Sequence, residues 1–407
     1  MQFLRDLCRN KGISLAAAWS FNQLAYAIVY PFIPIYLYQQ RGMPYTQVSL
    51  IFPLLGLAVI LAPLPCGWLT DKFGHGKMML AGQLLRGVIF FFLAFLVYIE
   101  APFWMFAVSL MFNTAVGCAF QVGSDAYLVS IAAPEERPSY YGKIRIGYNI
   151  GWATGPMLGA FFAKTPFWAF FIITGLLCVA GTFYTRITCC QNSADNRIGT
   201  EKTPSGAVTK EESIMRTISG NPRFILLMFG TLLLMTLASQ LYSTMSVFAT
   251  QSVGISNQAL GSIYSLNGFM VLVLQLPVTA LLTRMRVPLT IQLILGSVLY
   301  TVGYWQLGFA CGAWFIAAAV IIVTSGEIVI QPALYTAVSA EANSSNAGRM
   351  MLASSLMRGI GYSAGPWIGG QLFGKVPPLM LWGILSSFAV ISALAFAASG
   401  SRFCRKR

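Results

Sequence analysis

The stretch from residue 67 to residue 77, GWLTDKFGHGK, joins two long apolar segments through a short charged turn. The segment before the turn, residues 47–69, is uncharged, and both segments are long enough to cross a bilayer, which takes about 20 residues. Gly74 allows a tight reversal of the chain, while Lys72 and Lys77 keep the turn positive. The stretch therefore predicts a hairpin of two membrane-spanning helices whose turn is cytoplasmic.

The rest of the chain is as apolar as this hairpin. Of its 407 residues, 57% are hydrophobic and only 9% are charged, whereas a soluble domain carries about 25% charged residues. Uncharged runs of about 20 residues recur along the sequence, and each matches the thickness of the hydrocarbon core. The sequence therefore predicts an all-α membrane protein with twelve transmembrane helices. They begin near residues 13, 47, 78, 102, 142, 166, 224, 257, 288, 313, 350 and 378.

The net charge of +14 is distributed unevenly between the two faces of this helical array. Of the 26 Lys and Arg residues, Arg41, Lys164 and Lys375 fall on the face opposite the termini, and Arg86 and Arg358 lie inside spans. All the others fall on the face that carries both termini. Because cytoplasmic loops are enriched in Lys and Arg, both termini are predicted to be cytoplasmic, and a basic nucleic-acid surface is the weaker interpretation.

Few residues suited to enzymatic chemistry or metal binding are present. The chain has one histidine, His75, which lies in the charged turn, and its 8 cysteines form no C-x-x-C pair. This composition excludes clustered histidine metal sites and disfavours a Ser-His-Asp triad. The acids inside spans, Asp125 and Glu327, lie on separate predicted helices. We therefore predict no cofactor, no metal site and no enzymatic activity.

A pattern of three glycines and one proline occurs twice in the chain, 210 residues apart. The polar stretch between the two copies is predicted to be a flexible cytoplasmic linker. The sequence thus predicts two pseudo-symmetric six-helix bundles, residues 1–187 and 223–407, joined by a linker at residues 188–222. The pattern is Gly151, Gly155, Pro156 and Gly159 in the first half and Gly361, Gly365, Pro366 and Gly369 in the second, and Gln121 falls on Gln331 in the same frame.

Three ionisable residues lie deep within predicted spans. Glu327 is near the middle of the tenth span, Arg358 is in the eleventh and Arg86 is in the third. A charge at that depth costs on the order of 3 kcal/mol or more unless it is paired or hydrated, so function is the default hypothesis. We interpret all three as candidate proton-coupling or substrate-binding residues. The alternative is a static ion pair between helices, with Arg358 as the first candidate partner of Glu327 and Arg86 as the second.

Polar side chains follow helical spacing on several otherwise apolar spans. In a membrane, such side chains face other parts of the protein or water. They are predicted to line a cavity, and the alternative is hydrogen bonding between helices. The candidate cavity-lining residues are Asn22, Gln23, Tyr26, Tyr30, Asn113, Gln121, Gln240, Tyr264, Asn267, Thr324 and Gln331.

The charged turn resembles motif A of the major facilitator superfamily of transporters. It follows the pattern G-x-x-x-D-R/K-x-G-R/K between the second and third helices, except that His75 stands where a cation is usual and Lys77 is the nearest fixed positive charge. Residues 133–142 resemble the family's P-x-x-R-G loop between the fourth and fifth helices. The resemblance implies a cytoplasmic gate in which Asp125 bonds to the cations of the turn. The residues that carry this expectation are Gly67, Asp71, Lys72, Gly74, Lys77, Asp125 and Arg137.

Residues 151–159, GWATGPMLG, resemble motif C of the same superfamily, G-x-x-x-G-P-x-x-G, which is associated with antiporters. Together with Gly147, these residues place a glycine at every fourth position of one predicted helix. Such a stripe lets two helix backbones approach closely. It therefore predicts close helix packing, and the resemblance adds the expectation of antiport.

These features predict a secondary transporter that works by alternating access. The resemblance is strongest to the drug:proton antiporter branch and implies proton-coupled efflux of drugs or other amphipathic compounds. Two alternatives stay open: proton-coupled transport of an anionic metabolite or a sugar, and a receptor-like relative without transport. The predicted partners are a small-molecule substrate, protons and the lipid bilayer, without nucleic acid. The protein is predicted to be a monomer in a bacterial inner membrane.

Overall fold

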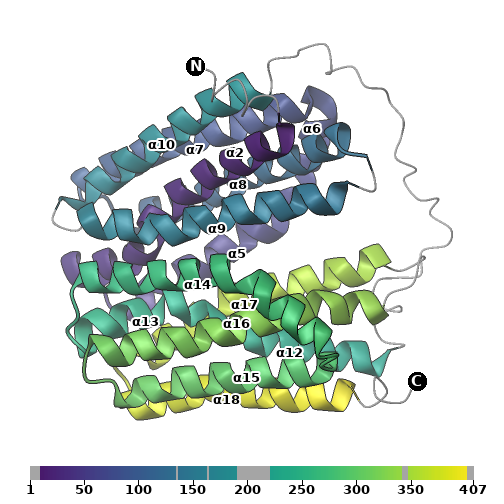
Figure 1. Cartoon of the computed structure of the whole chain (residues 1–407). Helices are drawn as coiled ribbons and strands as arrows, with labels where there is room; N and C mark the ends of the chain where they lie inside the picture. Colours follow the sequence, from purple (N-terminus) through teal and green to yellow (C-terminus); the bar gives the residue numbers. More distant parts are fainter. Residues whose placement is uncertain (1–9, 134–135, 163–164, 190–220, 342–346, 401–407) are drawn as a thin grey trace. The chain divides into compact units, whose positions relative to one another are not determined.

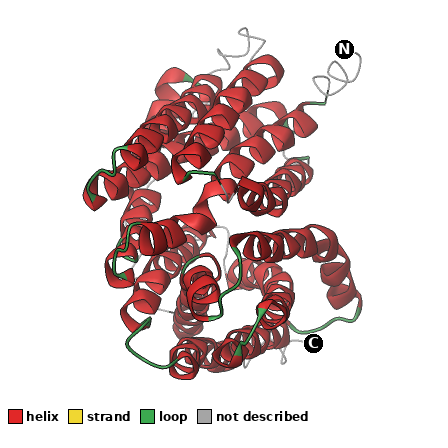
Figure 2. Cartoon of the chain, turned by 90° about the vertical axis from the view of Figure 1, so that its left-hand side faces the viewer, coloured by secondary structure: helices red, strands yellow, loops and turns green. Residues whose placement is uncertain are grey.

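The computed structural model describes residues 10–133, 136–162, 165–189, 221–341 and 347–400. Within these ranges all regular structure is helical, and no strand is present (Figures 1 and 2). The chain divides into two compact units, residues 1–33 with 57–208 and residues 34–56 with 209–407. The predicted linker at residues 188–222 lies almost entirely outside the described residues, so the predicted domain boundaries stay a prediction.

The first unit is built around five long helices. The helix of the first span, α2, ends in a 3-10 turn, η1. The chain returns to this unit within α5, and then forms the charged turn between α6 and α7. The elements are α2 Lys11–Val29, η1 Tyr30–Phe32, α5 Ile51–Leu61, α6 Pro63–Phe73, α7 His75–Tyr98, α8 Phe103–Ile131, α9 Arg137–Phe161 and α10 Phe167–Cys189.

The second unit contains the remaining helices and the short segments between α2 and α5. Its seventh predicted span is broken into four pieces, α12, η5, α13 and η6. The elements are α3 Ile33–Ile35, which begins at the unit boundary, η2 Tyr36–Gln40, α4 Tyr45–Val48, α12 Pro222–Ala238, η5 Ser239–Tyr242, α13 Thr244–Val247, η6 Phe248–Ser252, α14 Asn257–Arg284, α15 Leu289–Trp305, η7 Gln306–Phe309, α16 Ala313–Glu341, α17 Ala347–Leu372 and α18 Pro378–Ser399.

Each predicted span coincides with one of these helices or with a run of consecutive helical segments. Seven helices in the described residues are long and apolar enough to cross a membrane, and an eighth is formed if the pair Tyr45–Leu61 and Pro63–Phe73, bent by 42°, counts as one span. Pro63, at the start of α6, explains the bend. The other four spans are helical but shorter or more polar: α15 has 17 residues, α2 carries Asn22 and Gln23, and α9 and α17 carry glycines and charges.

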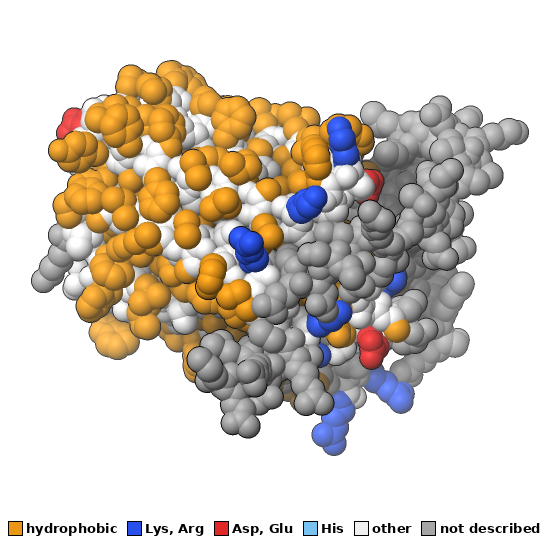
Figure 3. All heavy atoms as spheres, turned by 90° about the horizontal axis from the view of Figure 1, so that it is seen from above, with side chains coloured by type: hydrophobic (Ala, Val, Ile, Leu, Met, Phe, Trp, Pro, Cys, Tyr) orange, Lys and Arg blue, Asp and Glu red, His pale blue; other side chains and the backbone are white. Residues whose placement is uncertain are grey.

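The outer surface is suited to lipid. Large side chains such as Leu64, Trp314 and Phe161 are 80%, 88% and 75% exposed. Figure 3 shows hydrophobic side chains spread over most of one face, with Lys and Arg gathered toward one side. A soluble monomer rarely exposes such a continuous apolar surface. The helices therefore bury only part of their apolar surface within the protein, and the rest faces the bilayer.

The two glycine stripes occupy the same place in their respective units. In the first unit α9 packs on α2, and a Cβ added at Gly151 would lie 2.7 Å from Gln23 Cβ and Leu24 N. In the second unit α17 packs on α12 and η5, and a Cβ added at Gly361 would lie 2.6 Å from Leu232 O. In both units, glycine lets the fifth span pack directly on the backbone of the first, as expected for an internal repeat.

The break in the seventh span is stabilised by hydrogen bonds to neighbouring helices. At Ser243 the backbone leaves helical geometry, with φ −128° and ψ −93°. Tyr264 of α14 donates a hydrogen bond to Leu241 O at 2.6 Å, and Gln240 donates to Gly365 O at 2.7 Å. An unwound segment at membrane depth requires such partners, because lipid supplies none. The break is therefore specified by tertiary contacts.

Candidate functional site

Arg86 lies at the centre of a buried polar cluster in the first unit. It comes from the middle of α7 and is 5% exposed. Its Nη1 donates a hydrogen bond to Asn22 Oδ1 at 2.8 Å, and Asn22, from α2, is 3% exposed. The guanidinium also lies over the ring of Tyr26, 5.5 Å from its centroid. We name Arg86, Asn22, Tyr26, Tyr30 and Trp152 the arginine cluster.

Aromatic rings form one side of the arginine cluster. Tyr26 and Tyr30 are stacked with their centroids 4.8 Å apart, and Trp152 of α9 meets both edge-on, at 6.2 and 6.1 Å. Both tyrosines are partly exposed, so the cluster reaches the surface of its unit through them. The cluster thus combines a buried cation with aromatic rings that can make cation–π and aromatic contacts.

α8 contributes space and one hydrogen bond beside Arg86. Asn113 Nδ2 donates to the main-chain oxygen of Arg86 at 3.4 Å. A Cβ added at Gly117 would lie 3.5 Å from the Cδ, Nε and Cζ atoms of Arg86, in ordinary van der Waals contact. Asn113 therefore ties α8 to α7 where the arginine side chain departs, and Gly117 leaves its guanidinium uncrowded.

Glu327 belongs to a second polar cluster, in the second unit. It lies near the middle of the 29-residue helix α16 and is half-buried. Asn267 Nδ2 of α14 donates to Thr324 Oγ1 at 2.8 Å and to Glu327 Oε2 at 3.4 Å. Tyr242, in the break of the seventh span, donates its hydroxyl to Asn267 Oδ1 at 2.7 Å. We name Glu327, Asn267, Thr324 and Tyr242 the glutamate cluster.

Arg358 of α17 lies one helical turn along α16 from Glu327. Its Nη2 donates to Gln331 Oε1 at 2.9 Å, and its guanidinium lies 4.7 Å from the centroid of the Tyr335 ring. Gln331 and Tyr335 follow Glu327 at four-residue steps and so lie on the same face of the helix. Arg358 thus bonds to the face of α16 that carries the acid, through Gln331 and Tyr335.

The sequence matches the family model described as Major Facilitator Superfamily over residues 15–366. The chain belongs to this superfamily. Membership in this superfamily, like the relatives of the chain, assigns it to transporters rather than enzymes. The two helical units and their repeated glycine packing agree with that membership.

Curated relatives of this major facilitator protein span nearly its whole length. One is the "Uncharacterized MFS-type transporter YqjV" of Bacillus subtilis, 26% identical over 388 residues, which cover 93% of this chain and 91% of the relative. Another is the "Multidrug resistance protein MdtH" of Salmonella typhi, 22% identical over 396 residues, which cover 94% and 92%. The second name associates one such relative with drug resistance.

Solved structures confirm the superfamily fold. A POT family transporter in complex with a thioalcohol-conjugated peptide has a TM-score of 0.78 at 14% identity, with 98% of this chain and 97% of that chain covered. A mutant of the nucleoside transporter NupG has a TM-score of 0.75 at 14% identity, with coverage of 96% and 100%. At this identity the likeness concerns the fold alone. The predicted multi-pass helical membrane protein is thereby confirmed.

The motif A turn has the expected backbone. Gly74, with φ +88°, both ends α6 and begins α7, a conformation that favours glycine. Lys72 lies over the ring of Trp68, 5.0 Å from its centroid, and Arg137 Nε donates to Ala132 O at 3.4 Å. Within the described residues no ion pair joins Asp125 to a lysine of the turn. The predicted cytoplasmic gate stays a prediction, and it concerns a conformation in which the gate is closed. Its predicted residues are Gly67, Asp71, Lys72, Gly74, Lys77, Asp125 and Arg137.

Several residues that were predicted to line a cavity lie outside both clusters. Gln240 and Tyr264 are fully buried, and their hydrogen bonds stabilise the broken seventh span. Gln23 lies against Gly151, and Gln121 is exposed without belonging to either cluster. The arginine cluster brings together Asn22, Tyr26 and Tyr30, with Asn113 alongside, and the glutamate cluster brings together Asn267 and Thr324, with Gln331 one turn away.

Sequence reasoning did not single out Trp152 and Tyr242. Trp152 stands inside the motif C stretch, where only the glycines and proline were interpreted, yet its indole faces the two tyrosines of α2. Tyr242 stands between Gln240 and Ser243, and its role depends on the break of the helix. An aromatic residue beside a glycine stripe was the available signal for Trp152.

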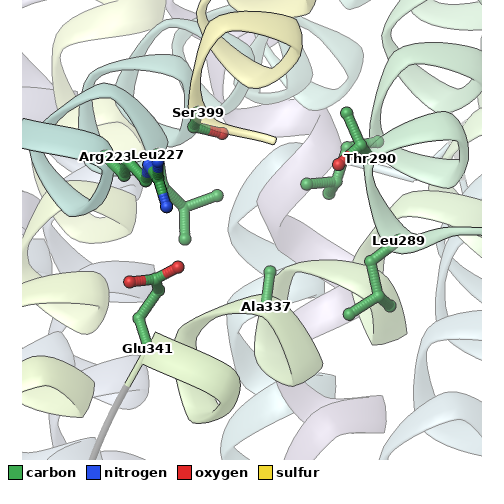
Figure 4. Close-up of a pocket in the computed structure, with 8 residues that line it drawn as sticks. Arg223, Leu227, Leu289, Thr290, Ala337, Glu341 and Ser399 are labelled. Atoms are coloured by element: carbon green, nitrogen blue, oxygen red, sulfur yellow. The ribbon is translucent and has the colours of Figure 1, made fainter. Parts of the chain in front are cut away.

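A small cavity lies at one end of the second unit, where the ends of α12, α15, α16 and α18 meet (Figure 4). Figure 4 shows Arg223 and Glu341 on one side of it and Leu289 and Thr290 on the other. Asn221 Nδ2 donates to Glu341 Oε2 at 2.9 Å and ties the start of α12 to the end of α16. Glu341 is about 20 Å of helix from Glu327, so this cavity is separate from the glutamate cluster.

Proposed function

We propose that this major facilitator protein is a proton-coupled secondary transporter that exports small amphipathic compounds. The observation that carries the proposal is the glutamate cluster: a half-buried acid near the middle of α16 is joined by hydrogen bonds to the broken part of another span. The drug-resistance name of the MdtH relatives and the motif C stretch support export over import. The drug-resistance name and the motif C stretch also fit transport in exchange for protons.

The glutamate cluster suits a coupling step. Asn267 donates a hydrogen bond from its amide nitrogen to Glu327 and accepts one at its amide oxygen from Tyr242. A change in the protonation of Glu327 therefore reaches the broken span through this one side chain. An ionised carboxylate accepts the bond from Asn267, whereas a protonated one also offers a donor. Protonation of Glu327 therefore changes which arrangement of the seventh span is favoured. Such a differential effect is what allows proton binding to shift a conformational equilibrium.

The proposed setting follows from the charge distribution and from the relatives. The excess of Lys and Arg on the terminal face supports cytoplasmic termini, and the bacterial relatives support a bacterial inner membrane. The proposed transporter acts as a monomer in the lipid bilayer, with protons as the coupling ion. Rocking of two helical repeats about a central site is the motion that this fold supports.

The test uses the full-length protein in liposomes with an imposed pH gradient and a panel of amphipathic solutes. Wild type is expected to move protons when a transported solute is present, and Glu327→Gln is expected to abolish this solute-dependent proton flux. Glu341→Gln is the matched control, since Glu341 is on the same helix but outside the glutamate cluster. Absence of solute-dependent proton flux in wild type would contradict the proposed function. Unchanged flux in Glu327→Gln would contradict only the role of Glu327.

A further inference from the structure

The buried cation of the first unit has no carboxylate partner in the part of the chain that the structure describes. Within the described residues, the guanidinium of Arg86 contacts Asn22 and the rings of Tyr26 and Phe90, and no carboxylate. Asp71 lies before the turn that begins α7 and Glu100 lies beyond its last residue, and Arg86 is about 17 Å of helix from either end of α7.

The other acids described in this unit also lie far along their helices. Asp125 is two helical turns beyond Gly117, which faces the arginine, and that spacing corresponds to about 12 Å. Glu136 lies before the first turn of α9, away from the glycine-rich middle of that helix. Among the described residues of the first unit, this mid-span positive charge therefore has no carboxylate beside it.

Arg86 and Asn22 also hold unused hydrogen-bond donors. Arg86 Nε and Asn22 Nδ2 are both inaccessible to solvent and have no acceptor in this structure. They belong to the two side chains that already share a hydrogen bond, so both donors are offered by one pair of residues. Leaving a buried donor unsatisfied costs free energy, and more where the group is charged. An acceptor supplied by a bound molecule would remove that cost.

We propose that Arg86 and Asn22 bind the anionic end of the transported solute and that the solute is an aromatic carboxylate. This inference rests on the proposed transport function and specifies its substrate class. A planar guanidinium and an amide donor match the oxygens of a carboxylate. The solute's ring lies against Tyr26, Tyr30 and Trp152, whose faces and edges favour aromatic contacts.

The charge of the solute has a consequence for transport. Export of one anion against entry of one proton moves two positive charges inward per cycle. A membrane potential that is negative inside then drives the exchange as well as the pH gradient does.

The test measures equilibrium binding of three matched probes to the detergent-purified full-length protein: 2-naphthoate, the neutral 2-naphthamide and the cationic 2-naphthylmethylammonium. Wild type is expected to bind 2-naphthoate about tenfold or more tightly than either of the others, as expected for charge-assisted hydrogen bonds. Arg86→Gln is expected to remove this preference. Asn22→Asp places a carboxylate of nearly unchanged shape beside Arg86 and is expected to remove the preference as well.

The wild-type comparison decides the inference even if a variant fails to fold. Equal binding of the three probes, or preference for the cation, would overturn it, and so would a folded Asn22→Asp protein that keeps the preference for 2-naphthoate. The measurement needs no pH gradient. Anion preference without proton flux would therefore refute only the proposed coupling, whereas proton flux with cationic solutes and no anion preference would refute only this inference.

Discussion

At the scale of single residues, the two clusters differ in what their hydrogen bonds do. In the glutamate cluster, Tyr242 and Thr324 occupy both ends of the Asn267 amide and so fix its orientation toward Glu327. The nearby Tyr264 hydroxyl instead binds the backbone of the broken span. Two tyrosines whose ring centroids lie only 4.8 Å apart thus have separate tasks, one facing the acid and one supporting the fold.

This separation predicts opposite outcomes for two Tyr→Phe substitutions. Tyr242→Phe releases Asn267 Oδ1 and is expected to lower solute-dependent proton flux several-fold while the melting temperature changes little. Tyr264→Phe leaves Leu241 O without a buried donor and is expected to cost about 1–3 kcal/mol of stability, which lowers the melting temperature. Flux assays in liposomes and thermal unfolding in detergent distinguish them. A loss of flux in Tyr242→Phe that merely follows a loss of folded protein would contradict the positioning role.

At the scale of elements, the glycine pattern was sufficient to predict which helices pack closely, because the requirement is local. A residue without Cβ is needed wherever one backbone touches another. The break of the seventh span could not be predicted in the same way. Its Leu241 carbonyl accepts a hydrogen bond from Tyr264 of α14, and its Gln240 side chain donates one to Gly365 O of α17, so both partners lie on other helices. Trp152 was missed for the same reason, since its partners lie on α2.

Two pairs of Gly→Ala substitutions test the repeated packing. Gly361→Ala is expected to destabilise the protein by about 1–3 kcal/mol, because its Cβ would meet Leu232 O at 2.6 Å. Gly359→Ala, on the same helix, meets nothing within 4 Å and is expected to be neutral or to stabilise by up to about 1 kcal/mol. Gly151→Ala and Gly142→Ala form the equivalent pair on α9. Similar melting temperatures within each pair would show that these helices do not pack as described.

At the scale of the whole molecule, composition and hydropathy indicated the fold class and the number of spans. The thickness of the bilayer fixes how long each apolar run has to be, so the runs can be counted along the sequence. The polar partner of each buried ionisable residue was not visible in the sequence. Glu327, Arg358 and Arg86 were grouped because each is costly in lipid, yet Arg86 bonds to Asn22 and Arg358 bonds to Gln331. Which cation accompanies which polar group depends on side-chain packing between helices, and no periodicity encodes that packing.

The predicted orientation of the chain can be tested with a native cysteine. Cys311 is exposed between η7 and α16, on the face opposite the termini if both termini are cytoplasmic, whereas Cys189 ends α10 on the terminal face. A membrane-impermeant maleimide added to intact cells is therefore expected to label Cys311, and Cys311→Ser is expected to remove that labelling. Cys189 is expected to react only after the membrane is permeabilised. Labelling of Cys189 but not Cys311 in intact cells would invert the topology, and with it the direction in which the pH gradient acts on Glu327.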